Sequence, residues 1–444
     1  MRRRLSAVSL LLVALSCAPE NVQRPPPPPL PLPAPTAVAQ PDVPKAYDSL
    51  ERGSFNQLAV RLNLPIFWAE DANSNRAVDP DEVRGLLFYP TSPQWVKAGK
   101  FSPEFDLAYT AMLASVHARS ENLAPEEAAR RALVLEELDQ GRPTLVRSDL
   151  RGYSPQDRAA LRSVLAATLE VERLFAQQTG MSQLAARVPT DDPASQSVLR
   201  RNWGPKCEGP KTEKNPACSA IPGAPKRKVD VYPAALQDDP KFCDTLEKRK
   251  DAKALLTPFT VVRDTAGVLS AVKYSEAYAQ GMQMVAAHLD QAANALGPDE
   301  RALADYLRAA AKAFRDNDWE SADEAWSKMN AQNSKFYLRI GPDEVYWEPC
   351  SQKAGFHVSL ARINKASLAW QDKLAPHQQE MEAAIAKLIG WPYKERKVAF
   401  KLPDFVDIVL NAGDSRQAFG ATIGQSLPNW GKVANESRGR TRWP

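Results

Sequence analysis

The stretch from residue 334 to residue 430 constrains the fold most, because strand-like and helix-like patterns alternate along it. It opens with the β-branched and aromatic run 334–340, which a Gly-Pro breaker follows and which predicts a buried strand. A second short extended piece is expected at 344–347. The next apolar residues have helical spacing and predict one long helix over the strands; they are Phe356, Leu360, Ile363, Leu368 and Leu374.

A further strand is predicted at 405–414, where an apolar run stops at the turn residue Gly413. Before this stretch, the pattern predicts a β-hairpin over 259–274 and three helices, at 275–296, 298–315 and 318–330. Short strands and longer helices therefore alternate irregularly. The expected fold class is α+β and predominantly α-helical, with a helical N-terminal region followed by an incomplete mixed α/β peptidase-like domain.

Three short motifs follow one another in this region. An E-x-Y pattern stands at 344–346, an N-K-A pattern at 364–366, and a G-x-x-L-P-N pattern at 424–429. In this order they resemble the dipeptidyl peptidase III family of zinc exopeptidases, over roughly residues 245–440. The resemblance implies a protein that takes dipeptides from the amino termini of peptides.

The resemblance also implies substrate-binding roles for Glu344, Tyr346 and Asn429. In the family, the glutamate pairs with the free amino group of the peptide and the other two help to align its backbone. Ser426 stands where the family often has another asparagine. The alternative is that Glu344 is an exposed strand residue and that Tyr346 packs under the helix.

Zinc is the cofactor that the resemblance implies, held by an H-E-x-x-G-H helix and a downstream glutamate. The chain has four histidines, none of which begins such a pattern and no two of which lie within one helical turn; they are His117, His288, His357 and His377. We therefore expect no catalytic residue and no zinc site in this chain. A truncated or frame-shifted gene product, ending before the zinc site, is the first explanation, and a genuinely non-catalytic protein is the second.

The first 45 residues predict export and anchoring. Residues 1–17 have a basic start, a short apolar core and a sequence around Cys17 that resembles a bacterial lipobox, so a lipid on Cys17 would attach the protein to a membrane. The alternative is an ordinary secretory signal. Residues 18–45 are rich in proline and predict a stiff tether, with a proline-recognition ligand as the alternative. The expected location is the bacterial cell envelope.

Residues 46–203 are expected to be helical, with a helix over 47–70 that breaks at Pro65 and further helices over 104–203. The charged residues of these helices, such as Arg130 and Glu137, are interpreted as solvated faces.

The segment 71–82 resembles the calcium loop of an EF-hand, which places oxygen ligands at fixed positions between two helices. The candidate ligands are Asp71, Asn73, Asn75, Ala77 through its carbonyl group, Asp79 and Glu82. Arg76 occupies the sharp turn that normally takes glycine, so we expect weak calcium binding. The alternative is a polar turn whose side chains bond their own backbone.

Residues 204–240 form a connector rich in proline and lysine before the peptidase-like region 241–444. Cys207 and Cys218 are predicted to form a local disulfide. Cys243 and Cys350 can form a second bond, although the sequence does not show that they meet. The net charge of +4 over 444 residues argues against a nucleic-acid partner.

These patterns predict an exported lipoprotein that carries a calcium loop and the substrate-side part of a peptidase-like protein. The alternative is a non-enzymatic, calcium-stabilised envelope lipoprotein that binds peptides or a protein partner. A purely structural helical lipoprotein is a third possibility, and it would bind neither zinc nor peptides.

Overall fold

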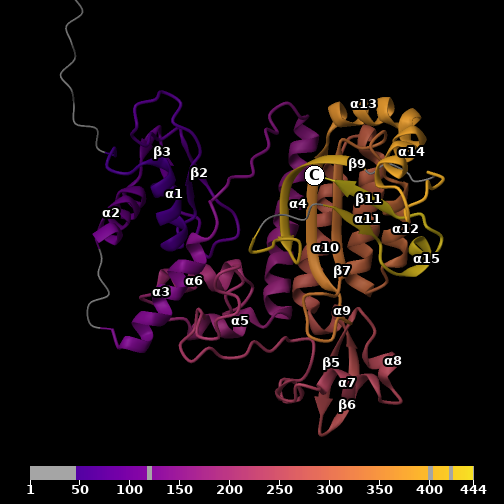
Figure 1. The fold of residues 1–444 in the computed structure, drawn as a ribbon, viewed down its shortest axis with the longest axis horizontal. Helices are drawn as coiled ribbons and strands as arrows, with labels where there is room; N and C mark the ends of the chain where they lie inside the picture. The colour runs from indigo at the N-terminus through magenta and orange to yellow at the C-terminus, as the bar shows by residue number, and fades with distance from the viewer. Residues whose placement is uncertain (1–46, 118–122, 399–403, 420–423, 444) are drawn as a thin grey trace, which may run out of the picture. The chain divides into compact units, whose positions relative to one another are not determined.

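The structure, a computed structural model, describes residues 47–117, 123–398, 404–419 and 424–443. The signal segment, the proline-rich tether and Cys17 lie outside these residues. Figure 1 shows the order of the elements along the chain. Among the described helices, none is both long enough and apolar enough to cross a membrane.

The N-terminal part is built on an aromatic core of its own, to which Phe55, Trp68, Trp95, Phe105 and Tyr109 contribute. Its elements are α1 (Arg52–Arg61), β1 (Ile66–Trp68), β2 (Val83–Gly85), β3 (Val96–Lys97), β4 (Lys100–Phe101) and α2 (Pro103–His117). The helix predicted over 47–70 is shorter than expected, because the chain turns after Leu62 and residues 66–68 form a strand. Asn56 holds that strand against α1, since its side chain bonds both the N–H group (2.8 Å) and the carbonyl oxygen (3.0 Å) of Trp68.

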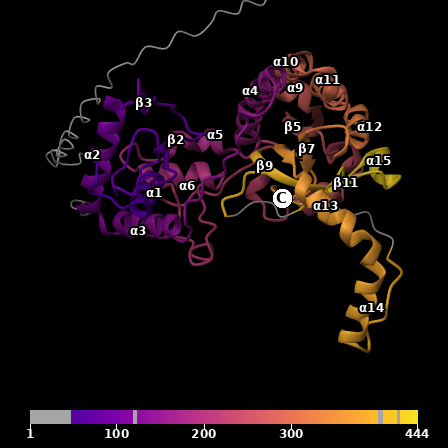
Figure 2. The ribbon, with the colours of Figure 1, turned by 90° about the horizontal axis from the view of Figure 1, so that it is seen from above.

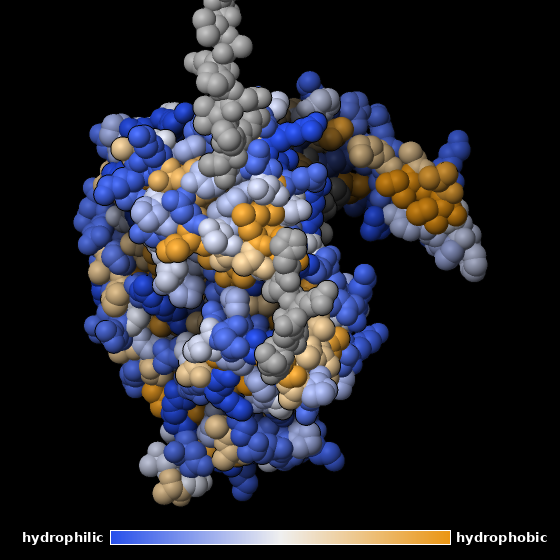
Figure 3. Space-filling model, turned by 90° about the vertical axis from the view of Figure 1, so that its left-hand side faces the viewer, coloured by the Kyte–Doolittle hydropathy of each residue, from blue (hydrophilic) through white to orange (hydrophobic). Residues whose placement is uncertain are grey.

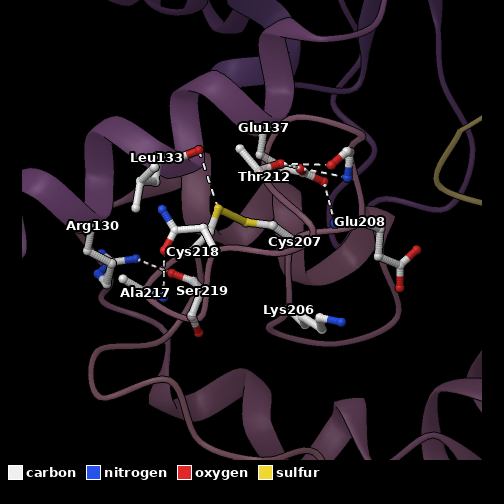
Figure 4. Close-up of a disulfide and its surroundings, with 12 residues drawn as sticks. Arg130, Leu133, Glu137, Lys206, Cys207, Glu208, Thr212, Ala217, Cys218 and Ser219 are labelled. Carbon is white, nitrogen blue, oxygen red and sulfur yellow. Dashed lines mark hydrogen bonds between the residues drawn. A yellow bond between two sulfur atoms is a disulfide. The ribbon is translucent and has the colours of Figure 1, made fainter.

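The second helical group holds the connector through buried charges. It comprises α3 (Pro125–Asp139), α5 (Met181–Leu184), the 3-10 turn Ala185–Arg187 and α6 (Pro193–Arg201). Arg130 and Glu137 were expected to be solvated, but both are buried. Glu137 accepts hydrogen bonds from the backbone of Glu208 and Gly209 in the connector (3.0 and 2.9 Å), near the Cys207–Cys218 disulfide (Figure 4). Several of the groups that bond Arg130 and Glu137 are far from the helix in sequence. The charge pattern of the helix alone therefore could not show that these two side chains are buried.

Three long helices form the largest core of the molecule: α4 (Pro155–Gln178), α10 (Ala279–Ala295) and α11 (Arg301–Asp316). The shorter α9 (Tyr274–Ala277) and α12 (Glu320–Lys328) and a 3-10 turn at Pro298–Glu300 adjoin them. Helix α4 begins at Pro155, because Ser154 and Asp157 form a capping box there. Helix α10 contacts both α4 and α11, and all three bury apolar faces there. A smaller appendage contains the 3-10 turn Leu236–Asp238, α7 (Phe242–Glu247), α8 (Ala252–Leu255) and the predicted hairpin of β5 (Thr260–Thr265) and β6 (Val268–Lys273).

A five-stranded sheet lies against these helices, in the order β10-β11-β9-β8-β7 (Figure 1). The strands are β7 (Phe336–Glu344), β8 (Gly355–Ile363), β9 (Asp404–Gly413), β10 (Gln425–Leu427) and β11 (Arg440–Trp443). Strand β8 is antiparallel to both β7 and β9, whereas β11 is parallel to β9 and antiparallel to β10. Strand β7 continues through the Gly-Pro pair that was expected to end it and stops at Glu344. The second extended piece predicted at 344–347 is wrong beyond Glu344, because residues 346 and 347 form a turn.

The helix predicted from Phe356 onward is wrong, because residues 355–363 form the interior strand β8, between β7 and β9. Phe356 lies beside Tyr274 (5.3 Å between ring centroids) and Phe314 (6.1 Å) on the helix-covered face of the sheet. Successive side chains of a strand point to opposite faces of the sheet, so His357, which follows Phe356, lies on the other face. It pairs there with Gly341 of β7. This second face carries the polar residues of the site described below.

After β8 the chain forms α13 (Lys365–Leu374), a 3-10 turn (Ala375–His377), α14 (Gln378–Ile389) and, further on, the short α15 (Gly431–Asn435). Asn364 of the N-K-A pattern caps α13, since its side chain accepts a hydrogen bond from the N–H group of Ser367 (3.0 Å). Helix α14 points away from the sheet in Figure 2, and apolar side chains gather on this arm in Figure 3. Exposed members of this surface are Trp370, Leu374, Met381, Ile385, Leu388, Ile389 and Trp391.

Candidate functional site

A cavity of about 780 Å³ opens where β7 and β9 reach their carboxyl ends. Its walls come from the end of β7, the turn after β9, the start of β10 and the connector around Trp203. The three residues that the resemblance assigned to substrate binding, Glu344, Tyr346 and Asn429, all line it. The fold therefore gathers them at one place.

Asn429 lies directly against the end of β7. Its side-chain amide donates hydrogen bonds to the carboxylate of Glu344 (3.1 Å) and to the backbone carbonyl of Asp343 (3.1 Å). This contact holds the Glu344 carboxylate at the wall of the cavity, and its remaining acceptor capacity suits a donor such as an ammonium group.

Tyr346 is on the turn after β7, and 81% of its surface is exposed. The alternative that it packs under a helix is therefore wrong. Its ring lies where it can contact a ligand that enters the cavity, together with Ser426, which lines the same wall.

Behind Glu344, the polar face of the sheet carries a buried hydrogen-bonded chain. The Arg339 guanidinium and His357 both bond the Asp343 carboxylate, and the other ring nitrogen of His357 lies 2.7 Å from the hydroxyl of Ser415. Burial would raise the pKa of Asp343, but Arg339 and His357 together hold it well below its usual range. These hydrogen bonds thus fix the end of β7 relative to the turn after β9.

Asp414, on that turn, is a site residue that sequence reasoning missed. Burial raises its pKa to about 6, and the negative charges of Glu344 and Asp343 add to this shift while His357 opposes it. The sequence held no direct signal for it, because β7 and β9 run in the same direction only through strand β8, which was predicted to be a helix. Residues that follow the two strands therefore meet at one edge of the sheet in a way that only the structure shows. Glu344 and Asp414 together make this side of the cavity acidic.

Arg416 and Trp203 form the opposite side of the cavity and were also missed. Arg416 bonds Glu172 of α4 (2.6 Å), and its guanidinium lies 4.0 Å from the centre of the Trp203 ring. The indole N–H of Trp203 donates to the carbonyl oxygen of Arg416 (2.9 Å). These contacts fix the turn 413–419 against the helical layer.

No metal centre forms among the residues that the structure describes. Across 47–117, 123–398, 404–419 and 424–443, no three histidine, cysteine, aspartate or glutamate side chains gather as a metal ion requires. His357 is committed to Asp343 and Ser415, and the exposed His377 lies 3.0 Å from Glu380.

The segment 71–82 has the backbone of a calcium loop in part. Arg76 has the left-handed conformation (φ 62°) expected for the turn, and the side chains of Asp71 and Asn75 accept hydrogen bonds from backbone N–H groups inside the loop. However, strands β1 and β2 flank the loop, and the expected helices are absent from both sides of it.

The carboxylates of Asp79 and Glu82 are hydrogen-bonded to protein groups in and beside the loop. Glu82 is buried, and its oxygens accept from the N–H group of Ala72 (2.6 Å) and the indole of Trp68 (2.9 Å). Asp79 accepts from the side chains of Asn73 (2.7 Å) and Asn75 (2.8 Å). These residues can bind a calcium ion only when these hydrogen bonds are broken and replaced by bonds to the ion.

The helical layer, the five-stranded sheet and the cavity at the strand ends define a peptidase-like fold, the fold of dipeptidyl peptidase III. Two solved structures share it: dipeptidyl peptidase III from Caldithrix abyssi, with a TM-score of 0.58 and 23% identity over 69% of this chain, and dipeptidyl-peptidase III from Corallococcus sp. strain EGB, with a TM-score of 0.56 and 22% identity over 72%. The chain spans 58% and 59% of the length of those proteins. Neither family models nor curated proteins gave a match. The resemblance seen in the motifs is thus confirmed for the fold.

Proposed function

We propose that the cavity around Glu344 binds the free amino terminus of short peptides, as the substrate side of a dipeptidyl peptidase III-like protein. The contact between Asn429 and Glu344 carries the proposal, because it holds a carboxylate at the cavity wall. Asp414 adds negative charge at neutral pH, and a peptide ammonium group would offset both charges. Tyr346 and Ser426 line the path of the peptide backbone.

The test is calorimetric titration of the full chain with tetra-alanine and with N-acetylated tetra-alanine. Free tetra-alanine is expected to bind and the acetylated form is not, because acetylation removes the positive charge. A charge-assisted hydrogen bond contributes about 1.5 to 3 kcal/mol, so Glu344→Gln should weaken binding roughly tenfold to a hundredfold. Glu380→Gln, at an exposed residue of α14, is the control. Equal binding of the two peptides, or no binding of either, would refute the proposal.

We also propose that the protein is exported and held at the membrane of a bacterial cell envelope by a lipid on Cys17. The support is indirect: all four cysteines among the described residues are paired, as Cys207–Cys218 and Cys243–Cys350, and disulfides persist in oxidising compartments. In a bacterial host, radiolabelled palmitate should enter the wild-type protein but not a Cys17→Ser variant. Label in both, or in neither, would contradict lipidation.

A non-enzymatic binding protein is the second candidate. The exposed apolar side chains on α13 and α14 favour it, because a large apolar surface of this kind commonly contacts another molecule. Both candidate functions include a weak calcium site at 71–82. The left-handed backbone conformation of Arg76 supports this site.

A further inference from the structure

A second cavity, of about 530 Å³, lies beside the first and is not used by the proposed peptide site. It is enclosed by the segment 88–90, by α4, by the turn that contains α5, and by α6. Most of its walls are apolar, and they include Phe88, Leu169, Ala176, Met181, Val188 and Leu199. A volume of this size is in the range of pockets that hold small organic molecules.

Arg200 of α6 brings a positive charge into this apolar space. Its Nε donates a hydrogen bond to the side-chain oxygen of Asn63 (3.1 Å), and its guanidinium carbon lies 3.7 Å from the centre of the Tyr89 ring. The side chain is half-buried. Burial lowers the pKa of Arg200, and Tyr89 and the negative charge of Glu172 oppose this shift. Within the described parts of the chain, no carboxylate lies within ion-pair distance of Arg200.

The other two arginines that line the cavity are each paired with a carboxylate. Arg416 is paired with Glu172 (2.6 Å), and Arg173 is paired with Glu170. Three arginines but a single glutamate, Glu172, line the cavity, so its walls carry an excess of positive charge. The tyrosine ring and the asparagine amide offset the charge of Arg200 only in part.

The geometry points to a binding site for a small organic carboxylate with an apolar body, its carboxylate on Arg200 and its hydrocarbon part against the walls formed by α4 and α6. A planar guanidinium binds a carboxylate through two parallel hydrogen bonds, which a neutral ligand of the same shape does not form. Trp203 and Arg416 line both cavities, so the two sites share one wall but use different charged groups.

Calorimetry of the full chain with three probes tests the site: 4-phenylbutyrate, its neutral amide 4-phenylbutyramide, and acetate. The carboxylate with the aromatic body is expected to bind at least tenfold more tightly than either of the others, because only it satisfies both Arg200 and the apolar walls. Octanoate, in a fourth titration, separates a preference for an aromatic acid from a preference for a fatty acid.

Variants locate the site. Arg200→Met should weaken 4-phenylbutyrate binding at least tenfold, and Ala186→Phe should do the same by filling the cavity, whereas Arg151→Met, at an exposed arginine outside it, should change binding less than twofold. Glu344→Gln should leave it unchanged, which separates this site from the peptide site. Equal affinity for the acid and its amide, no binding of the acid at 10 mM, or full binding by a folded Arg200→Met variant would each overturn the proposal.

Discussion

The side-chain amide of Asn429 lies 3.1 Å from the carboxylate of Glu344, although the two residues are 85 positions apart in the chain. One belongs to the end of β7 and the other follows β10. Strands β7 and β10 are the two outer strands of the sheet, so the contact forms because the segment after β10 reaches the end of β7 at the shared cavity. The predictions below test this edge of the sheet and the parts of the fold that support it.

The first prediction concerns Asp414. Its pKa in the folded protein is raised to about 6, so between about pH 4 and pH 6 the folded chain keeps a proton that the unfolded chain has released. Stability should therefore fall as pH rises through this window. Asp414→Asn should be more stable than wild type at pH 7.5 by about 1 to 3 kcal/mol and nearly equal to it at pH 4, as measured by urea unfolding. An equal difference at both pH values would contradict the raised pKa.

The second prediction concerns the buried pair of Arg339 and Asp343. Arg339 also pairs with Asp323 (2.8 Å), so its removal leaves the buried carboxylate of Asp343 and the half-buried carboxylate of Asp323 without this cation. Arg339→Met should lower the free energy of unfolding by about 3 to 5 kcal/mol. Arg151→Met breaks an exposed pair with Asp149 and is the matched control, for which we expect no measurable change. A small effect of Arg339→Met would show that these carboxylates are hydrated or protonated.

The third prediction compares the two disulfides, which close segments of very different length. Cys243 and Cys350 are 107 positions apart, whereas Cys207 and Cys218 are 11 apart. Chain-entropy estimates for loops of these lengths are about 5 and about 3 kcal/mol. Replacing both cysteines of the longer pair by serine should therefore cost about 2 kcal/mol more than replacing both of the shorter pair. Denaturant unfolding of the two double variants measures the difference, and the reverse order would contradict this account.

The fourth prediction concerns calcium at the loop 71–82. With a dissociation constant near 1 mM, 10 mM calcium would stabilise the protein by about 1.4 kcal/mol, which corresponds to a rise of roughly 1 to 3 °C in melting temperature. Magnesium at the same concentration controls for ionic strength. The shift should disappear in Asp71→Ala and Glu82→Ala. An equal shift in these variants, or none in the wild type, would favour the polar-turn interpretation.

The fifth prediction concerns catalysis. The chain of 444 residues has no two histidines within one helical turn, so we expect it not to release dipeptides from a dipeptidyl naphthylamide substrate. The assay is run with and without added zinc. Turnover that a zinc chelator abolishes would show that scattered residues do form a metal site.

Local sequence signals predicted the elements that neighbouring residues decide. The capping box at Ser154 and Asp157 fixed the start of α4, and the turn before Gly267 fixed the hairpin of β5 and β6. Residues 356–363 were misread, because their apolar residues satisfy a helical and an extended period at once. The hydrogen bonds from β7 and β9 decided for a strand.

The sequence by itself indicated three of the residues that line the cavity, since the E-x-Y and P-N motifs pointed to Glu344, Tyr346 and Asn429 before any fold was known. Only the tertiary structure decided that Asp414 and Arg416 join them and that Arg200 has no carboxylate partner among the described residues. The physical reason is range: helix caps and turns depend on residues a few positions apart, whereas the burial of a charge and the partner it meets depend on how segments hundreds of residues apart pack together.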